Sequence, residues 1–452
     1  MSSPTSILSL PNELLVIIAG QYEQVPWGRS GWYHRAIEAK YRSEWVLSRL
    51  CRRLRNVVIG APTLWTNITV IPNTFQRGSG LGEILRLYLQ RSIPLKVSIS
   101  LQIFALANNA IVWRESWFRD ISHEINRVER LSIVLGLRPN DLGQEFLPLR
   151  HVAAPNLLHL EIENRNVRSR PPCPVELFSG GAPKLSSVWM QGFFPFPAPS
   201  WMSSLTRFQS ATAGQRLDDA AANLYLSALR QPSGLVYLLL DLAGLGTVPT
   251  DYQIRIPSLR FLSVWIDIYN QQEPYLLQIM DFFSCPALSE LVVFGSHGHQ
   301  VFSLLNTFSF PRTSFPMLHA LSFINTDLEC SCEYNMPLPT RTHLVDTPLF
   351  PTLSSLTLMK QCFMSDLIRE IIGTSPLPLP SLQTLTLRPS PGEPVVNVRH
   401  ALLDAMLRLP QTLPKLRLSP ALYYEEDWRE VDQEVTVFDP ERLDHALQVR
   451  GF

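Results

Sequence analysis

The stretch Pro155-Asn-Leu157-Leu-His-Leu160-Glu-Ile162 decides the fold, because its phrase of one proline and three spaced apolar residues recurs along the chain. In general form the phrase is Pro-x-Leu-x-x-Leu-x-apolar. Further copies begin at Pro183, Pro257, Pro286, Pro316, Pro351 and Pro380. Variants without the proline are built on Leu131, Leu205 and Leu235, and a shorter copy follows Pro414. So many matches to a four-position pattern indicate a chain built from one repeated structural unit.

Each repeat is expected to contain one short β-strand. The last two apolar positions of the phrase are two residues apart, which is the spacing of side chains on one face of a strand. Proline cannot donate a backbone hydrogen bond, so it belongs at the first residue of such a strand or before it. Segments between the strands, such as 117–125 and 220–230, have the apolar spacing or the composition of helices.

The predicted fold class is therefore α/β, with one strand and one helix per repeat. Pro155 and Pro380 are eight repeats apart when two proline-free copies between them are counted, so a repeat averages about 28 residues. This period is typical of leucine-rich repeats, and about ten of them predict a curved solenoid lined by parallel strands. An ordinary α/β domain would explain the alternation of strands and helices, but not the fixed phrase.

Residues 1–70 have a different pattern, which predicts two amphipathic helices. Pro11 suits the first turn of a helix on which Leu10, Leu14 and Ile18 share a face, with Leu15 beside it. A second apolar run ends at Gly60, which is a typical helix stop. The apolar members of this run are Val46, Leu47, Leu50, Leu54, Val57 and Val58.

These N-terminal residues resemble an F-box. The resemblance is carried by Leu10-Pro-x-Glu-Leu-Leu-x-x-Ile18, then Leu50-Cys-Arg-Arg-Leu-Arg55, then Ala61-Pro-Thr-Leu-Trp65. The whole arrangement is similar to that of fungal F-box proteins with degenerate leucine-rich repeats. Two features depart from the family pattern. Leu54 stands where the family usually has an aromatic residue, and the span Gln21–Glu44 is longer than in a compact F-box.

The resemblance implies that the F-box docks on a Skp-family adaptor, and through it on a cullin, while the repeats bind a protein substrate. The chain would then be the non-catalytic substrate-recognition subunit of a Skp/cullin/F-box ubiquitin ligase. Carried over by position, the adaptor-binding residues are Leu10, Pro11, Leu14, Leu15, Ile18, Val46, Leu47, Cys51 and Leu54. The alternative is a repeat-based protein-interaction scaffold outside the ubiquitin system, in which the N-terminal helices cap the solenoid.

If the strands run as predicted, the residues that alternate with the inward apolar positions face the concave surface. The candidate substrate-binding residues on this surface are Glu161, Trp189, Trp265, Asp267, Phe294, Met359 and Arg388. Exposed aromatic side chains there would resemble binding hot spots, and the alternative is that loops or neighbouring side chains cover them. Their mixed chemistry favours an unidentified protein as substrate over nucleic acid, whose phosphates call for arginine and lysine along the face.

The predicted domains are an F-box-like helical domain at residues 1–70, a connecting segment with the solenoid start at 71–125, and a leucine-rich-repeat-like solenoid at 126–420. An acidic C-terminal tail follows at 421–452. In that tail nine Asp or Glu oppose three Arg, a net of −6. Between residues 27 and 60, by contrast, eight Lys or Arg oppose two Glu, a net of +6.

The overall charge narrows the function classes. The 452 residues include 39 Lys or Arg and 39 Asp or Glu, so general binding to nucleic acid or to a membrane surface is not indicated. No apolar stretch approaches the length of a membrane helix, and Pro11 and Glu13 interrupt the first apolar run, so no secretory leader is expected. Six scattered cysteines predict reduced thiols and a cytoplasmic or nuclear location.

No motif in the sequence predicts an enzyme. The glycine-rich stretch Gly78-Ser-Gly-Leu-Gly82 lacks the Lys-Ser/Thr ending of a phosphate-binding loop. His297 with His299 and Cys330 with Cys332 could supply four zinc ligands, but their spacing is unusual and they fall in different repeats. We therefore expect no catalytic residue, no metal and no cofactor.

Overall fold

The computed structural model describes residues 9–21, 43–70, 80–104, 111–136, 146–164, 173–195, 199–211, 219–230, 232–242, 253–266, 282–295, 315–325, 350–359, 367–368, 379, 381–388 and 415–418. The chain divides into two compact units, and their boundary lies between Ser204 and Leu205. This boundary falls inside the predicted solenoid segment 126–420. The predicted domain boundaries near residues 70, 125 and 420 stay predictions, and the acidic tail 421–452 lies outside the described residues.

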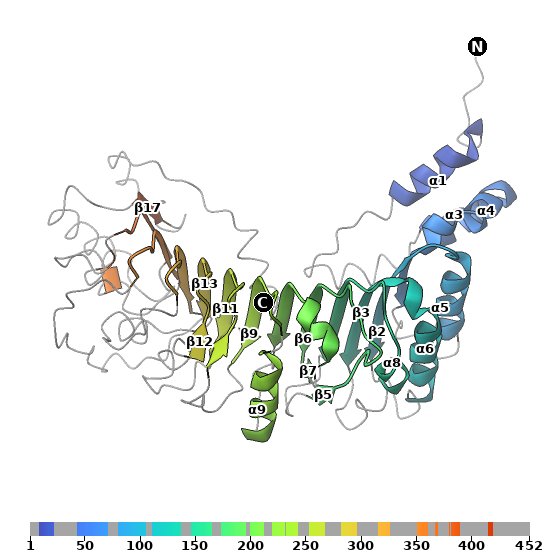
Figure 1. Ribbon diagram of the computed structural model, residues 1–452. Coiled ribbons are helices and arrows are strands. Elements are labelled where there is room, and N and C mark those ends of the chain that lie inside the picture. The colour runs from blue at the N-terminus through green and yellow to red at the C-terminus, as the bar shows by residue number, and fades with distance from the viewer. Residues whose placement is uncertain are drawn as a thin grey trace, which may run out of the picture. The chain divides into compact units, whose positions relative to one another are not determined.

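The first unit is built on a parallel sheet. Its neighbouring strands are β1 (Asn67–Val70), β2 (Val97–Phe104), β3 (Val128–Gly136), β4 (His159–Asn164) and β6 (Ser187–Gln191), in that order. Helices α5 (Gly80–Arg91), α6 (Ile111–Glu124) and α8 (Leu147–Arg150) contact one another in turn and form a layer beside β2 and β3 (Figure 1). Two shorter strands, β5 (Cys173–Val175) and β7 (Phe193–Pro195), pair separately. Before β3 lies the 3-10 turn η5 (Ile125–Arg127), and η8 (Ser200–Ser204) follows β7.

The second unit repeats the same arrangement. Its parallel strands are β8 (Arg207–Ala211), β9 (Tyr237–Asp241), β11 (Phe261–Trp265), β13 (Glu290–Phe294), β14 (Ala320–Ile324), β15 (Ser355–Met359), β16 (Thr384–Arg388) and β17 (Lys415–Leu418). Helix α9 (Asp219–Ala228) precedes β9, and the short strands β10 (Ile254–Arg255) and β12 (Phe283–Ser284) form a separate pair. The expectation of an α/β protein with successive parallel strands is therefore confirmed.

From Pro155 to Pro351, the described proline of each phrase lies in a tight turn four residues before the strand. The carbonyl of the residue before the proline accepts the N–H of the phrase's first leucine, for example Leu288 to Cys285 at 3.0 Å and Leu259 to Ile256 at 3.3 Å. Proline at the second position of such a turn presets its backbone angle and gives up no hydrogen bond. The residue before the proline is buried in every described copy, as Ala154 and Phe315 illustrate. The phrase therefore contains a further apolar position that the sequence pattern did not include.

The register between strands is set directly after this turn. The carbonyl of the residue after the first leucine accepts two backbone N–H groups from the next repeat; Arg260 O, for example, binds Ser289 N at 2.9 Å and Glu290 N at 3.0 Å. Equivalent residues of successive strands consequently stand side by side. The second leucines of the phrase form one such row, Leu262, Leu291, Leu321, Leu356 and Leu385, and Leu416 of the shorter copy pairs in register with Leu385.

Where a polar residue follows the proline, its side chain links the turn to the one before it. The Thr352 hydroxyl lies 3.2 Å from the carbonyl oxygen of Pro316 and 2.9 Å from that of Leu318. Ser258 approaches the equivalent carbonyls of Ser233 and Leu235 at 2.9 and 2.7 Å. These bonds satisfy turn carbonyls that the sheet itself does not reach.

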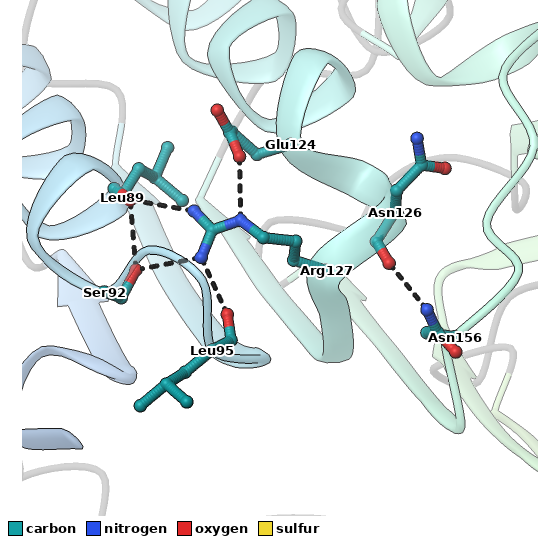
Figure 2. A network of polar contacts seen from close by, with 7 residues as sticks. All are labelled: Leu89, Ser92, Leu95, Glu124, Asn126, Arg127 and Asn156. Carbon is teal, nitrogen blue, oxygen red and sulfur yellow. Dashed lines mark hydrogen bonds and ion pairs between the residues drawn. The ribbon is translucent and has the colours of Figure 1, made fainter. Parts of the chain in front are cut away.

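In the first unit the side-chain amide of Asn156 and the guanidinium of Arg127 also donate hydrogen bonds to backbone carbonyls of the preceding segment (Figure 2). The Asn156 amide donates to Asn126 O at 2.7 Å. Arg127 Nη1 and Nη2 donate to the carbonyls of Leu95 and Leu89 at 2.7 and 2.8 Å, and Nε pairs with Glu124 at 2.9 Å. Arg127 therefore connects the end of α6 to the loop between α5 and β2.

Burial of Cys285 predicts that the second unit becomes less stable at alkaline pH. Burial raises the pKa of the Cys285 thiol from 9.0 to about 12, and a hydrogen bond with the Ile256 backbone opposes this only in part. Because the folded pKa lies above the unfolded one, the stabilisation is complete below pH 9 and is lost as the pH rises toward 12. At pH 10 the free energy of unfolding should be about 1.4 kcal/mol lower than at neutral pH.

Urea unfolding of the full chain at pH 7.5 and pH 10 measures this loss. Cys285→Ala should unfold at lower urea at both pH values because it leaves a small cavity, but its loss between them should be about 1.4 kcal/mol smaller. An equal pH-dependent loss in both proteins would show that Cys285 does not carry the effect.

Candidate functional site

The N-terminal helices carry apolar side chains on two faces. Helix α1 (Asn12–Gln21) begins after Pro11, whose carbonyl accepts the Leu15 N–H at 3.2 Å. Leu15 and Ala19, four residues apart, are buried within the unit. Leu14 and Ile18, on a neighbouring face, are 44% and 46% exposed, and Ile17 beside them is 56% exposed. Helix α1 therefore uses one apolar face for packing and presents the other to solvent.

Helices α3 (Ser43–Leu50) and α4 (Arg52–Ile59) repeat this division. The Cys51 sulfur accepts the Leu54 N–H at 3.5 Å and caps α4, which fixes the turn between the two helices. Leu54 and Val58 are the buried side chains of α4. Exposed apolar side chains on the two helices are Val46 at 43%, Leu50 at 64% and Ile59 at 42%.

Arginines hold the three helices together. Arg53 donates to Leu10 O at 2.8 Å and lies 3.3 Å from the Asn12 side chain, so α4 is tied to the beginning of α1. Arg55 donates to Ser48 O at 2.8 Å, which ties α4 to α3. These bonds to backbone oxygens order the helices without covering the exposed apolar side chains. We call the exposed side chains of Leu14, Ile17, Ile18, Val46, Leu50 and Ile59 the apolar surface.

A buried polar cluster attaches α3 to α5, and the two helices lie near each other in Figure 1. Glu44 is fully buried, and its carboxylate accepts a hydrogen bond from the Tyr88 hydroxyl. The same hydroxyl accepts the Trp45 indole N–H at 2.7 Å. A buried carboxylate is costly without such donors, so the cluster specifies how α3 packs on α5.

Trp65 makes a second attachment. It ends the 3-10 turn η4 (Pro62–Trp65), and its indole N–H donates to Val58 O at 2.8 Å at the end of α4. Its ring meets the Tyr88 ring edge-on at 4.9 Å, and the Arg91 guanidinium lies 4.4 Å from its centroid. The helical segment and the first strands of the sheet therefore share one core.

The predicted adaptor-binding residues divide into three groups in the structure. Pro11, Leu14, Ile18 and Val46 are exposed, and Leu10, Leu47 and Cys51 are half-buried. Leu15 and Leu54 are buried and pack inside the unit rather than lying on an exposed surface, and the assignment of these residues to adaptor binding stays a prediction. The sequence prediction missed Ile17, Leu50 and Ile59. Ile17 could have been found from its spacing, because it lies three residues from Leu14 and one from Ile18.

Four of the predicted substrate-binding residues are not exposed as expected, and their role in substrate binding stays a prediction. Trp189, Trp265, Phe294 and Met359 are buried, whereas Glu161 is half-buried. Adjacent strands lie close enough for equivalent rings to stack, and the Trp265 and Phe294 rings do so at a centroid distance of 4.3 Å and an angle of 9°. Neighbouring side chains thus contribute to covering the rings. Asp267 lies outside the described residues, and of Arg388 only the backbone at the end of β16 is described.

On that face the first residue of each strand that follows the phrase, from β4 to β16, is instead half-buried. In the second unit Arg207, Tyr237 and Phe261 are half-buried neighbours on β8, β9 and β11. The Arg207 guanidinium lies 4.3 Å from the Tyr237 ring centroid, and the Tyr237 and Phe261 rings stack at 4.4 Å. This half-buried row offers aromatic edges and one cation to a partner.

Metal-binding side chains do not cluster within the described residues. Among them no group of three His, Cys, Asp or Glu side chains could hold a metal ion. The pairs His297/His299 and Cys330/Cys332 lie outside these ranges, and the expectation that the chain has no metal stays a prediction. No helix within the described residues combines the length and apolar character that crossing a membrane requires.

Comparison with known proteins gives no further guide. No family model matches the chain, and no curated protein matches it.

The attachment of the helices to α5 should depend on one hydroxyl. In Tyr88→Phe, Glu44 loses this donor and Trp45 its acceptor, so we expect the free energy of unfolding of the first unit to fall by about 1–3 kcal/mol. Hydrogen exchange across residues 43–59 should accelerate accordingly. The matched control is Ser122→Ala, whose hydroxyl bonds only within its own helix and whose loss should change stability by less than about 0.5 kcal/mol. Equal protection in both variants would refute the attachment.

Proposed function

We propose that this protein is the substrate-recognition subunit of a Skp/cullin/F-box ubiquitin ligase. Residues 1–70 act as the F-box and dock on a Skp-family adaptor, and the repeats form a leucine-rich-repeat-like solenoid that binds a protein substrate. The protein itself has no catalytic role. The proposal rests on the F-box-like residues described above together with one structural observation, the apolar surface.

The apolar surface supports docking because exposed large apolar side chains are concentrated on the N-terminal helices. Of ten such side chains among the described residues, six lie between Leu14 and Ile59. Clustered exposed apolar residues typically mark a protein contact, whereas scattered ones carry no meaning. The arginine bonds and the Cys51 cap hold these side chains in place before any partner arrives, which lowers the entropy cost of association.

The regular register of the sheet supports the solenoid. Equivalent residues of consecutive phrases pair directly in both units, so each repeat contacts mainly its neighbours, as repeat proteins do. Within the solenoid we assign substrate contact to the half-buried row that contains Arg207, Tyr237 and Phe261.

The docking assignment predicts that charge on the apolar surface abolishes adaptor binding. Co-expression of the wild-type chain with a Skp-family adaptor should give a stable one-to-one complex in size-exclusion chromatography. The variant Leu14→Asp/Ile18→Asp should bind at least about 100-fold more weakly, since two carboxylates would be buried without partners. Both side chains are already half-exposed, so the fold should survive, which circular dichroism and the unfolding midpoint can verify.

The matched control is Met317→Asp, which places one charge on a side chain of similar exposure, 51%, in the second unit. It should bind the adaptor as the wild type does. Co-elution of Leu14→Asp/Ile18→Asp with the adaptor would contradict the docking assignment.

A second function is favoured by the buried cluster around Glu44. Because Glu44, Tyr88 and Trp65 join the helices firmly to the sheet, the helices would also serve as a cap for a repeat scaffold outside the ubiquitin system. A wild-type chain that elutes as a folded monomer beside unbound adaptor would favour this scaffold.

A further inference from the structure

The apolar surface is flanked by positive charge. On α3, Arg49 follows Val46 by three residues and precedes Leu50. On α4, Arg52, Arg55 and Ile59 recur at the three- and four-residue spacing of one helix face, whereas Leu54 and Val58 are the buried side chains. The side chains of these arginines are exposed. Guanidinium groups and large aliphatic side chains therefore alternate along the same two helices.

This positive charge is not neutralised within the described residues. Between residues 9 and 70 the structure describes two carboxylates, Glu13 and Glu44, and Glu44 is buried against Tyr88. Arg55 bonds to a backbone oxygen and Arg49 lies 5.9 Å from the Trp45 ring centroid. The described ion pairs of the first unit join other residues, namely Arg86–Asp120, Lys96–Glu129, Arg127–Glu124 and Arg150–Glu176. Arg49, Arg52 and Arg55 are thus available to an external anion.

We propose that the occupant of this surface is an acidic protein whose apolar groove is bordered by Asp and Glu side chains, and that Arg49, Arg52 and Arg55 pair with this border. The inference rests on the proposed function and adds a partner chemistry to it: the adaptor that binds this chain presents carboxylates around its groove. The complementary charge is what selects the partner, because exposed apolar side chains alone would accept any apolar groove.

A protein fits this surface better than a membrane or a nucleic acid does. The apolar side chains come from three short helices, α1, α3 and α4, of eight to ten residues each, rather than from one long amphipathic helix that could lie in a lipid interface. Large aliphatic side chains between the arginines have no counterpart in a row of phosphates. A protein groove that is lined by apolar side chains and bordered by carboxylates would match both the aliphatic side chains and the arginines, because guanidinium forms paired hydrogen bonds with carboxylates.

The charges should act mainly on the rate of association. Exposed opposite charges steer two proteins toward each other over a distance set by the salt concentration, about 10 Å at 0.1 M and about 3 Å at 1 M. Contacts between apolar groups persist in salt. Association should therefore slow as salt rises, while dissociation, which is governed by the buried apolar contacts, should change little.

The test measures association and dissociation rates of the full chain with a purified Skp-family adaptor at 50 mM and 500 mM NaCl. In the variant Arg49→Glu/Arg52→Glu the association rate at 50 mM salt should be at least about tenfold lower than in the wild type, and the difference should shrink at 500 mM. The matched control is Arg255→Glu/Arg260→Glu, which makes the same charge change at exposed arginines of the second unit and should alter the rate less than about twofold. Arg49→Lys/Arg52→Lys keeps the charge and should associate at nearly the wild-type rate.

The outcomes separate this inference from the proposed function. Wild-type-like association of Arg49→Glu/Arg52→Glu, with the adaptor still bound, would overturn the inference and leave the proposed function standing. Equal slowing by the control variant would also overturn it, because net charge rather than this surface would then be responsible. If the wild-type chain does not bind the adaptor but binds vesicles of phosphatidylcholine with phosphatidylserine, or duplex DNA, both the inference and the proposed function are overturned. Loss of adaptor binding at every salt concentration in Leu14→Asp/Ile18→Asp, beside a salt-dependent defect in Arg49→Glu/Arg52→Glu, would support both.

Discussion

Each repeat depends on one carbonyl oxygen that accepts two backbone N–H groups from the repeat that follows. In the second unit the carbonyl of Arg260 serves Ser289 and Glu290, and that of His319 serves Ser354 and Ser355. A shift of one residue would break this pair of hydrogen bonds and would also turn every leucine of the strand to the opposite face. The proline turn places this carbonyl correctly, because its geometry is fixed before the strand begins. The apolar core, the row of second leucines and the row of first strand residues all follow from that single constraint.

The strands could be predicted from sequence because their determinants are local. The proline, the first leucine and the two alternating apolar residues lie within eight positions, and the structure places a strand at each described copy. The sequence did not show whether side chains on the other face of each strand are exposed or buried. Whether Trp265 meets solvent depends on what stands on the next strand, and there Phe294 stacks on its ring. A periodic pattern predicts on which face of the strand a side chain lies, but not whether a neighbouring side chain covers it.

The N-terminal helices show a related limit. Both Leu14 and Leu15 belong to apolar stripes of α1, and spacing alone does not choose which stripe packs inward. The structure resolves this through contacts distant in sequence, such as the bond from Arg53 to Leu10 and the packing of α1 on α4. Glu44 illustrates the same point: in the sequence it is one charged residue near a helix start, and in the structure it is buried against Tyr88, 44 residues away. Its burial also removes one of the two described carboxylates that could have neutralised the exposed arginines.

The fixed turn and register have a consequence for how such a chain can change during evolution. Where two adjacent repeats both contain the proline, the distance between the prolines varies from 28 residues, between Pro155 and Pro183, to 35 residues, between Pro316 and Pro351. The strands that follow Pro316 and Pro351 nevertheless pair without a shift, Ala320 with Ser355 and Ile324 with Met359. Since the turn resets the register at each repeat, residues inserted upstream of a proline change the connection and leave the sheet intact. Selection can therefore lengthen, shorten or rewrite the connections one at a time, which gives this architecture a large supply of new surfaces at small risk to folding.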